Sequence, residues 1–424
     1  MKRMWLAFIA VVVVAGLMAI PAAGVQLVFW THEDPNRTPL EERYVDEFEA
    51  MYPGVTIQRV AYPSGEMAQV VLTAFAAHQG PDIFNQEQSP EFPYIVNQRV
   101  APVNPVALGY PSVQAIYDAY QTGTLDGATY EGNLYGLPLE FTNWCLFVNT
   151  KYFREVGLNP GTDYPKTWEE MVTVSQQLAM RNGDILTRRG FDFRYPYYLT
   201  FLLPMVEQLG GALLSEDGQT GIINDAAWLQ VLNYFQQWGP NGLNLGSPTY
   251  TAARKEFNKD NNAIAMCESG LYQIDRIRTE NPAFYASNEW MIIPFPVWEN
   301  AVNNYASNTY AHYYMVNAES TSEKQEWAWK FIAFMLSHGE EYLLNCGLVQ
   351  PTKTLMASEA YQSLPYAEIF AADIARAKSQ PLNVANPQLE AALKVAIESV
   401  MLSGVTPEQA LQTLRQTVNE ILQD

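Results

Sequence analysis

The side chains of this chain that could do chemistry are, first of all, acidic groups at the ends of apolar runs. Two carboxylates that face each other across a glycosidic bond can act as general acid and as base or nucleophile. Five acidic residues stand at such places: Glu33, Asp34, Glu87, Glu140 and Glu268. Because 45 of the 424 residues are acidic, their presence alone carries little weight. A glycoside hydrolase is therefore an alternative and not the leading interpretation.

Other signatures of catalysis or metal binding are missing from the sequence. The histidines lack the paired spacing of a zinc site; they are His32, His78, His312 and His338. The sequence has no P-loop, no Gly-x-Gly-x-x-Gly after a strand and no Gly-x-Ser-x-Gly turn. We therefore expect no catalytic residue, metal or cofactor, and predict that the protein is not an enzyme.

Aromatic and hydrogen-bonding side chains gather where strands and turns end. Aromatic residues make up 13% of the chain and charged residues 17%. An aromatic ring can cover the apolar face of a pyranose, while carboxylates and amides pair with its hydroxyl groups. This mixture favours reversible binding of a mono- or oligosaccharide.

Two other small solutes remain open. The tyrosine pairs 197–198 and 313–314 could hold a ferric ion. The formal net charge of −20 would attract a polyamine, and it argues against nucleic acid as a partner.

The first residues indicate export. Lys2 and Arg3 precede an apolar run over residues 5–20, and Ala22, Ala23 and Gly24 follow it. This pattern predicts a signal peptide over residues 1–24, cleaved after Gly24, with an uncleaved membrane anchor as the alternative. No cysteine stands at the cleavage point, so we expect a freely diffusing periplasmic protein.

The three cysteines, Cys145, Cys267 and Cys346, each lie in an apolar context, which predicts buried residues. One disulfide among them remains possible, since export would permit it.

The periodicity predicts an α/β fold. Strand-like runs over residues 25–30 and 55–60 flank a helical pattern, and a second helix leads into the short apolar run Ile83-Phe84. Ligands bind beyond the carboxyl ends of strands in such sheets. Thr167 and Glu170 have capping-box spacing, as do Thr406 and Gln409. Aromatic residues recur at helical spacing from Trp228 to Trp238, which indicates a core helix.

Nearly the whole mature chain resembles the extracellular solute-binding proteins of ABC importers, in the branch typified by the maltose-binding protein. The segments that carry the resemblance are residues 25–30, 80–83 (GPDI), 130–138 (YEGNLYGLP), 146–151 (LFVNTK), 165–170 (PKTWEE), 210–211, 257–259 with 263–266, and 347–351 (GLVQP).

The resemblance implies a two-lobed periplasmic-binding-protein fold, in which each lobe is a mainly parallel sheet flanked by helices. It implies an N-terminal lobe of residues 25–139 and 294–337 and a C-terminal lobe of residues 140–293 and 338–424. Crossing hinge segments are expected near Leu139, Ile293 and His338. The lobes would close on the ligand and present it to the transmembrane subunits of a permease, with the protein acting as a monomer.

The family's pocket, carried over position by position, implies a ligand-binding set. It consists of Trp30, His32, Glu33, Gln86, Glu87, Glu140, Asn143, Tyr197, Tyr198 and Tyr272. Where many relatives have a Gly-Gly turn, this chain has residues 307–310 (SNTY), which would add Asn308 and Tyr310 to the cleft. We also expect Glu268, one of the acidic candidates, to contact the ligand. Tyr272 stands where the family often has a sugar-stacking Trp, while Trp30, Tyr197 and Tyr198 could equally belong to the core. The stretch 387–393 lacks the stacking Trp of the maltose-binding branch, which favours a different sugar.

Overall fold

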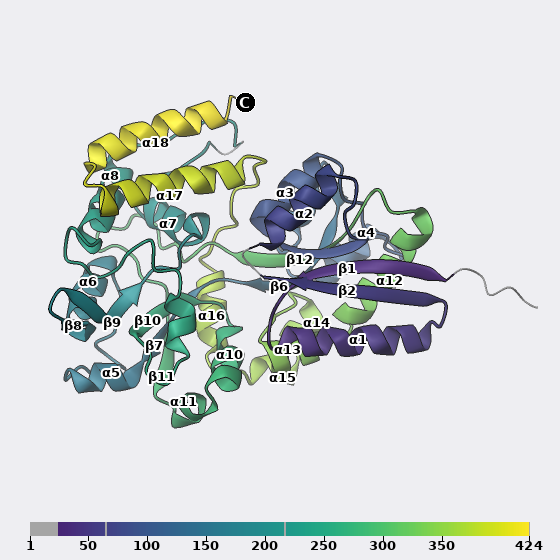
Figure 1. Cartoon of the computed structure of the whole chain (residues 1–424), viewed down its shortest axis with the longest axis horizontal. Coiled ribbons are helices and arrows are strands. Elements are labelled where there is room, and N and C mark those ends of the chain that lie inside the picture. Colours follow the sequence, from purple (N-terminus) through teal and green to yellow (C-terminus); the bar gives the residue numbers. More distant parts are fainter. Residues whose placement is uncertain (1–23, 64–65, 216–217, 424) are drawn as a thin grey trace, which may run out of the picture.

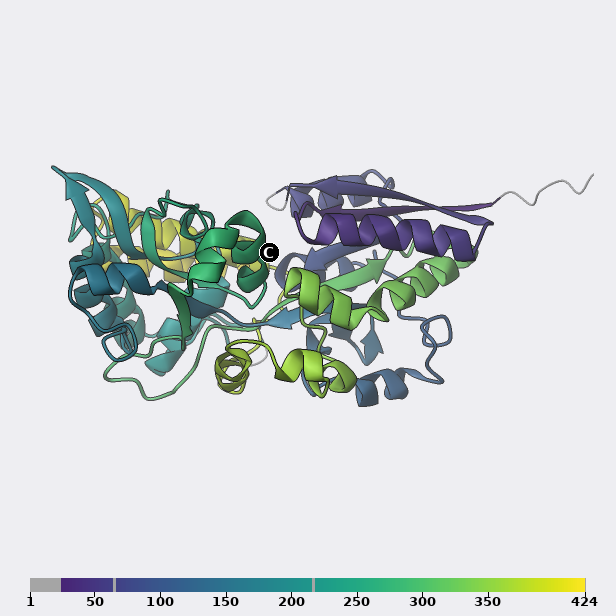
Figure 2. The same ribbon diagram turned by 90° about the horizontal axis from the view of Figure 1, so that it is seen from below.

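Two five-stranded sheets, each flanked by helices, form the two lobes of the molecule (Figure 1). The computed structural model describes residues 24–63, 66–215 and 218–423. The predicted signal peptide therefore lies outside the described residues, except for Gly24. Viewed from below, the lobes lie end to end and are joined by segments at their middle (Figure 2). The predicted two-lobed α/β fold is confirmed.

The first sheet has the order β2-β1-β3-β12-β6. Its strands are β1 (Val25–His32), β2 (Val55–Tyr62), β3 (Ile83–Glu87), β6 (Gly136–Thr142) and β12 (Tyr310–Val316). β1 pairs in parallel with β2 and β3, whereas β12 is antiparallel to both β3 and β6. The predicted β-α-β beginning is confirmed, because an apolar strand followed by a helical period must cross over to pair in parallel.

The second sheet has the order β11-β7-β10-β9-β8. Its strands are β7 (Cys145–Asn149), β8 (Met180–Asn182), β9 (Ile185–Asp192), β10 (Ile264–Ser269) and β11 (Trp290–Ile293). Only β9 and β10 pair in parallel, so the prediction of a mainly parallel sheet is wrong for this lobe. The reason is the path of the chain: β7 carries it away from the first lobe, and β11 carries it back. The prediction is also wrong for the first sheet, where two pairings are parallel and two are antiparallel.

The helices pack on both sheets. In chain order they begin with α1 (Arg37–Met51), α2 (Met67–Ala76), α3 (Gln88–Val96), α4 (Val113–Ala119), the 3₁₀ turn η1 (Asp126–Ala128), α5 (Thr150–Glu155), α6 (Trp168–Leu178), α7 (Tyr198–Gln208) and α8 (Asp225–Trp238). They continue with α9 (Ala253–Phe257), α10 (Gln273–Glu280), α11 (Pro282–Ser287), α12 (Ser322–Leu336), α13 (Gly339–Cys346), α14 (Lys353–Met356), α15 (Glu359–Gln362), α16 (Ala367–Ile374), α17 (Asn386–Leu402) and α18 (Pro407–Ile421). A short hairpin pairs β4 (Thr129–Tyr130) with β5 (Asn133–Leu134).

The chain passes between the two sheets at defined places. β6 of the first sheet is followed at once by β7 of the second, with residues 143–144 between them. Residues 294–309 lead back from β11 to β12. After His338, α13 contributes Tyr342 to the first core and Leu343 to a cluster in the second lobe. The predicted lobe boundaries remain a prediction.

Local sequence signals explain how several helices begin and which face they bury. Thr167 Oγ1 accepts from the Glu170 N–H at 3.1 Å, and Thr406 with Gln409 forms a capping box. Trp228 and Trp238 of α8 are fully buried in the second core, as the helical spacing predicts. The cysteines are all free and buried.

Close packing of α6 on β9 yields a test of the second core. A Cβ atom at Gly190 in β9 would collide with the backbone of Ser175 in α6. We expect Gly190→Ala to lower the free energy of unfolding by about 1–3 kcal/mol, because backbone atoms must shift. Gly54, with no neighbouring atom within 4 Å of an added Cβ, is the matched control. Urea denaturation of both variants checks this, and equal midpoints would contradict the packing.

Candidate functional site

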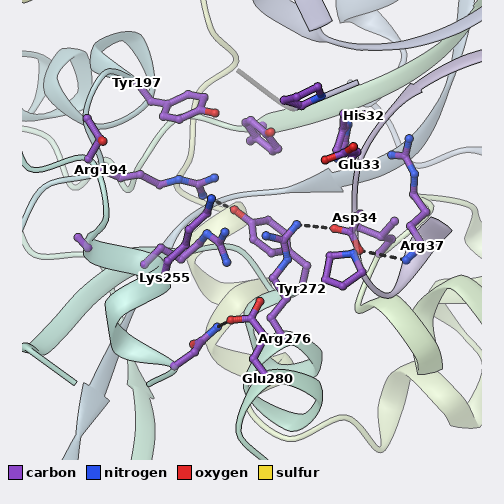
Figure 3. A pocket seen from close by; sticks show the side chains of 18 of the residues that line it. His32, Glu33, Asp34, Arg37, Arg194, Tyr197, Lys255, Tyr272, Arg276 and Glu280 are labelled. Atoms are coloured by element: carbon purple, nitrogen blue, oxygen red, sulfur yellow. Dashed lines mark hydrogen bonds and ion pairs between the residues drawn. The ribbon is translucent and has the colours of Figure 1, made fainter. Parts of the chain in front are cut away.

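A cleft of about 920 Å³ lies between the two lobes (Figure 3). The loop after β1 and strands β6 and β12 line it from the first lobe. The loop after β9 and helices α9 and α10 line it from the second. The carboxyl ends of β1 and β9 both open onto this space, as expected for ligand sites in α/β sheets.

Six of the predicted ligand-binding residues line the cleft. They are His32, Glu33, Glu140, Tyr197, Tyr272 and Tyr310. These six residues are separate in sequence, and the fold brings them to one cleft.

Other predicted residues lie just behind the cleft wall. Glu87 accepts hydrogen bonds from Tyr310 Oη at 3.1 Å and from Tyr197 Oη at 3.5 Å. Its neighbour Gln86 is buried, and Trp30 packs edge-on against Tyr62 with ring centroids 5.0 Å apart. Glu87 thus orients two tyrosines that line the cleft.

Four predicted residues belong to the packing of the hinge and the second lobe. Tyr198 is fully buried, with its ring centroid 5.5 Å from that of Phe201. Asn308 Nδ2 donates to the carbonyl of Leu199 at 2.8 Å. Asn143 is fully buried in the first crossing, and Glu268 is buried at the end of β10. None of these four residues is among those that line the cleft.

Burial determines the protonation state of Glu140, an acidic residue that lines the cleft. Burial raises the pKa of the Glu140 carboxyl to about 8, against the opposing effect of Arg276 and Arg194. Its Oε1 atom has no hydrogen-bond partner among the described residues, although Glu140 lines the cleft. At neutral pH, Glu140 can therefore donate a proton in a hydrogen bond and accept another, which suits a sugar hydroxyl.

Two histidines of the first lobe are neutral at pH 7. The ring centroids of His32 and His312 lie 5.0 Å apart. Burial, followed by the nearby Arg37, lowers the pKa of both and brings that of His312 to about 3. His312 Nε2 shares a hydrogen bond with Tyr310 Oη at 2.8 Å.

The sequence interpretation missed the arginines that line the second-lobe wall. Arg194 lies with its guanidinium carbon 4.4 Å from the ring centroid of Trp144 and donates to Tyr272 Oη. Arg276 pairs with Asp34 of the first lobe and lies 5.2 Å from the Tyr272 ring centroid. Figure 3 shows Arg194 and Arg276 converging on Tyr272. No sequence signal marked them, since they are far apart in a sequence whose net charge is negative.

The geometry weakens both non-sugar alternatives. Tyr198 lies in the second core, while Tyr313 and Tyr314 are buried in the first and donate to the Thr124 carbonyl and to Glu41. These tyrosines cannot meet around one ferric ion. Because Arg194, Arg254 and Arg276 line the cleft, its second-lobe wall would repel a polyamine.

Residues 24–63, 66–215 and 218–423 contain no group of three or more His, Cys, Asp or Glu side chains placed to hold a metal ion. Within the same ranges, no helix has the length and apolar character needed to cross a bilayer.

Two α/β lobes around a polar, aromatic-lined cleft define the class of two-lobed solute-binding proteins. The chain belongs to the bacterial extracellular solute-binding protein family, whose sequence pattern matches residues 34–342. It is 26% identical over 255 residues to the arabinooligosaccharide-binding protein of Bacillus subtilis. That alignment covers 56% of this chain and 54% of the relative, so the match spans about half the length of the curated protein.

Solved structures show the same fold at low sequence identity. An ABC transporter solute-binding protein from Thermotoga lettingae, bound with α-D-tagatose, superposes with a TM-score of 0.81 at 18% identity, covering 94% of this chain and 100% of that one. A substrate-binding protein from Listeria monocytogenes in complex with cycloalternan gives a TM-score of 0.80 at 17% identity, with coverages of 94% and 99%.

The raised pKa of Glu140 predicts a pH-dependent stability. The folded-state pKa of about 8 exceeds the ordinary value of 4.5, so the stability from this carboxyl is full below pH 4.5 and is lost as the pH rises through 8. Glu140→Gln keeps the neutral shape and should lose less stability than the wild type over this window. The difference should grow by at most about 1.4 kcal/mol per pH unit. Denaturation of the unliganded proteins across the window checks it, and parallel curves would refute it.

Proposed function

We propose that this protein is the non-catalytic binding component of an ABC importer, which takes a mono- or oligosaccharide into the interlobe cleft and delivers it to a permease. The observation that carries the proposal is the cleft itself, with tyrosine rings and unpaired polar atoms facing the same space in a member of the solute-binding family. The relatives named for arabino-oligosaccharide and tagatose support a sugar.

The cleft offers both kinds of contact that a sugar needs. Tyr197, Tyr272 and Tyr310 provide rings, which can cover the C–H faces of a pyranose. Glu140 Oε1 and the carboxylate of Glu33 can pair with hydroxyl groups, each of which must find a partner once water is displaced.

Closure of the lobes would complete the site. Asp34 of the first lobe pairs with Arg276 of the second, and Glu87 of the first accepts from Tyr197 of the second. Such polar contacts can form and break at small net cost, so ligand binding can shift the balance between open and closed forms.

The proposal includes export, a permease partner and the absence of turnover. The family description and the predicted signal peptide over residues 1–24 support export to the periplasm. A hydrolase would instead need two carboxyls in acid and base roles. Glu33, Asp34 and Glu140 line the cleft, but Asp34 is paired with Arg276, and the other two candidates, Glu87 and Glu268, are not among the lining residues.

Calorimetry against a saccharide panel that includes arabino-oligosaccharides, tagatose and malto-oligosaccharides tests the proposal. We expect at least one sugar to bind with a dissociation constant near micromolar, about −8 kcal/mol. The same sugar should be recovered unchanged, and small-angle scattering should show a more compact protein. Failure of every saccharide to bind, or recovery of a shortened product, would refute the function.

Tyr197 provides a residue-level test of the aromatic wall. Its ring is partly exposed in the cleft and lies edge-on to Trp144 at 5.3 Å between centroids. Tyr197→Ala should weaken binding of the panel's best sugar by about 1–3 kcal/mol, because a ring contact is lost. Tyr52→Ala, at the exposed end of α1, is the control and should bind as the wild type does. Calorimetry on both variants decides, and unchanged affinity in Tyr197→Ala would remove this residue from the site.

A further inference from the structure

Basic residues are concentrated in the cleft of an otherwise acidic protein. The chain has 25 Lys and Arg residues and a formal net charge of −20. Six of these cations line the cleft: Arg37, Arg194, Arg254, Lys255, Lys259 and Arg276. The cleft wall therefore differs in charge from the chain as a whole.

Half of these cations are neutralised by carboxylates. Arg37 pairs with Glu41 at 3.0 Å, Lys259 pairs with Glu256, and Arg276 pairs with Asp34. The other three, Arg194, Arg254 and Lys255, form no ion pair with any residue that the structure describes. All three come from the second lobe.

Arg254 is positioned by a neutral amide. Its Nη1 atom donates to Gln273 Oε1 at 3.3 Å, and Gln273 Nε2 in turn donates to Asn258 Oδ1. Gln273 and Asn258 are both buried, so the amide network is held in place. Burial, together with Arg276 and Arg194, lowers the pKa of Arg254 to about 10. The guanidinium is thus oriented without an ion pair to any carboxylate that the structure describes.

Arg194 is held in a similar way by aromatic groups. Its guanidinium carbon lies 4.4 Å from the ring centroid of Trp144 and 4.9 Å from that of Tyr197. Its one side-chain hydrogen bond among the described residues goes to Tyr272 Oη. Ring faces and a phenol hold a cation in place without cancelling its charge.

Among the described residues, the carboxyls that line the cleft form no ion pair with Arg194, Arg254 or Lys255. Asp34 is engaged by Arg276, and the pKa of Glu140 is raised to about 8, which keeps it protonated at neutral pH. Glu280 accepts from Asn258 Nδ2 at 2.8 Å. Glu33 and Asp260 are exposed.

On the basis of the proposed function, we infer that the saccharide carries an oxyanion, which is the carboxylate of a uronic acid or a phosphate ester. This group binds against Arg194 and Arg254, with Lys255 beside it. A guanidinium fork matches the two oxygens of such a group and forms charge-assisted hydrogen bonds. A neutral hydroxyl can accept one of these hydrogen bonds but leaves the repulsion among the arginines in place.

Calorimetry with matched acidic and neutral probes tests this inference. The first arm compares trigalacturonate, trimannuronate and glucuronate-substituted xylotriose with their methyl esters. The second arm compares glucose 1-phosphate and galactose 1-phosphate with glucose and galactose. In at least one arm the acidic probe should bind roughly 10-fold or more tightly than its neutral counterpart, and added salt should reduce the advantage. The arm that responds identifies the oxyanion.

Variants connect this preference to the arginines. Arg254→Gln should abolish the preference for the acidic probe, and Arg254→Lys should restore part of it. Arg278→Gln is the control, since Arg278 lies on α10 outside the cleft and pairs with Asp275. Melting curves exclude misfolded variants.

The outcomes separate the two proposals. Equal or tighter binding of the neutral probes, or an acidic preference that survives in Arg254→Gln, would overturn this inference and leave saccharide binding standing. No binding of any saccharide, acidic or neutral, would overturn the proposed function as well.

Discussion

The guanidinium of Arg194 is the point at which the second-lobe wall of the cleft is held together. Trp144 from the crossing and Tyr197 from the loop before α7 pack against it, and Tyr272 at the start of α10 accepts a hydrogen bond from it. Its backbone N–H donates to Glu268 at the end of β10 at 3.0 Å. A partly desolvated cation is costly unless it is surrounded in this way, so these segments must keep their relative positions for the charge to be tolerated.

Polar groups of the first lobe contact this wall. Asp34 pairs with Arg276, and Glu87 accepts hydrogen bonds from Tyr197 and from Tyr310 of strand β12. His312 of the same strand shares a hydrogen bond with Tyr310. Hydrogen bonds and ion pairs of this kind exchange for contacts with water when the lobes separate, so the free-energy difference between open and closed forms stays small. A ligand of moderate affinity can then decide the balance.

Much of the fold could be predicted because its signals are local. The β-α-β start, the capping residues Thr167 and Thr406, and the buried face of α8 each depend on short-range spacing. The direction of β7 and β11 could not be predicted in this way, because it follows from where the chain enters and leaves the lobe. Of the candidate site, the tyrosine pair 197–198 divides into one cleft residue and one core residue, since α7 begins between them. Arg194, Arg254 and Arg276 come from three separate segments, and only folding brings them together.

The place of β12 in the first sheet governs the order in which the protein can be assembled. β12 lies between β3 and β6, yet it is made after every strand of the second sheet. The first five-stranded sheet therefore stays split into two parts, each with an open edge, until residues 310–316 are present. The second sheet can close earlier from contiguous chain. Long-range pairing of this kind is slow to form, so the sheet that begins the sequence is the later of the two sheets to be completed.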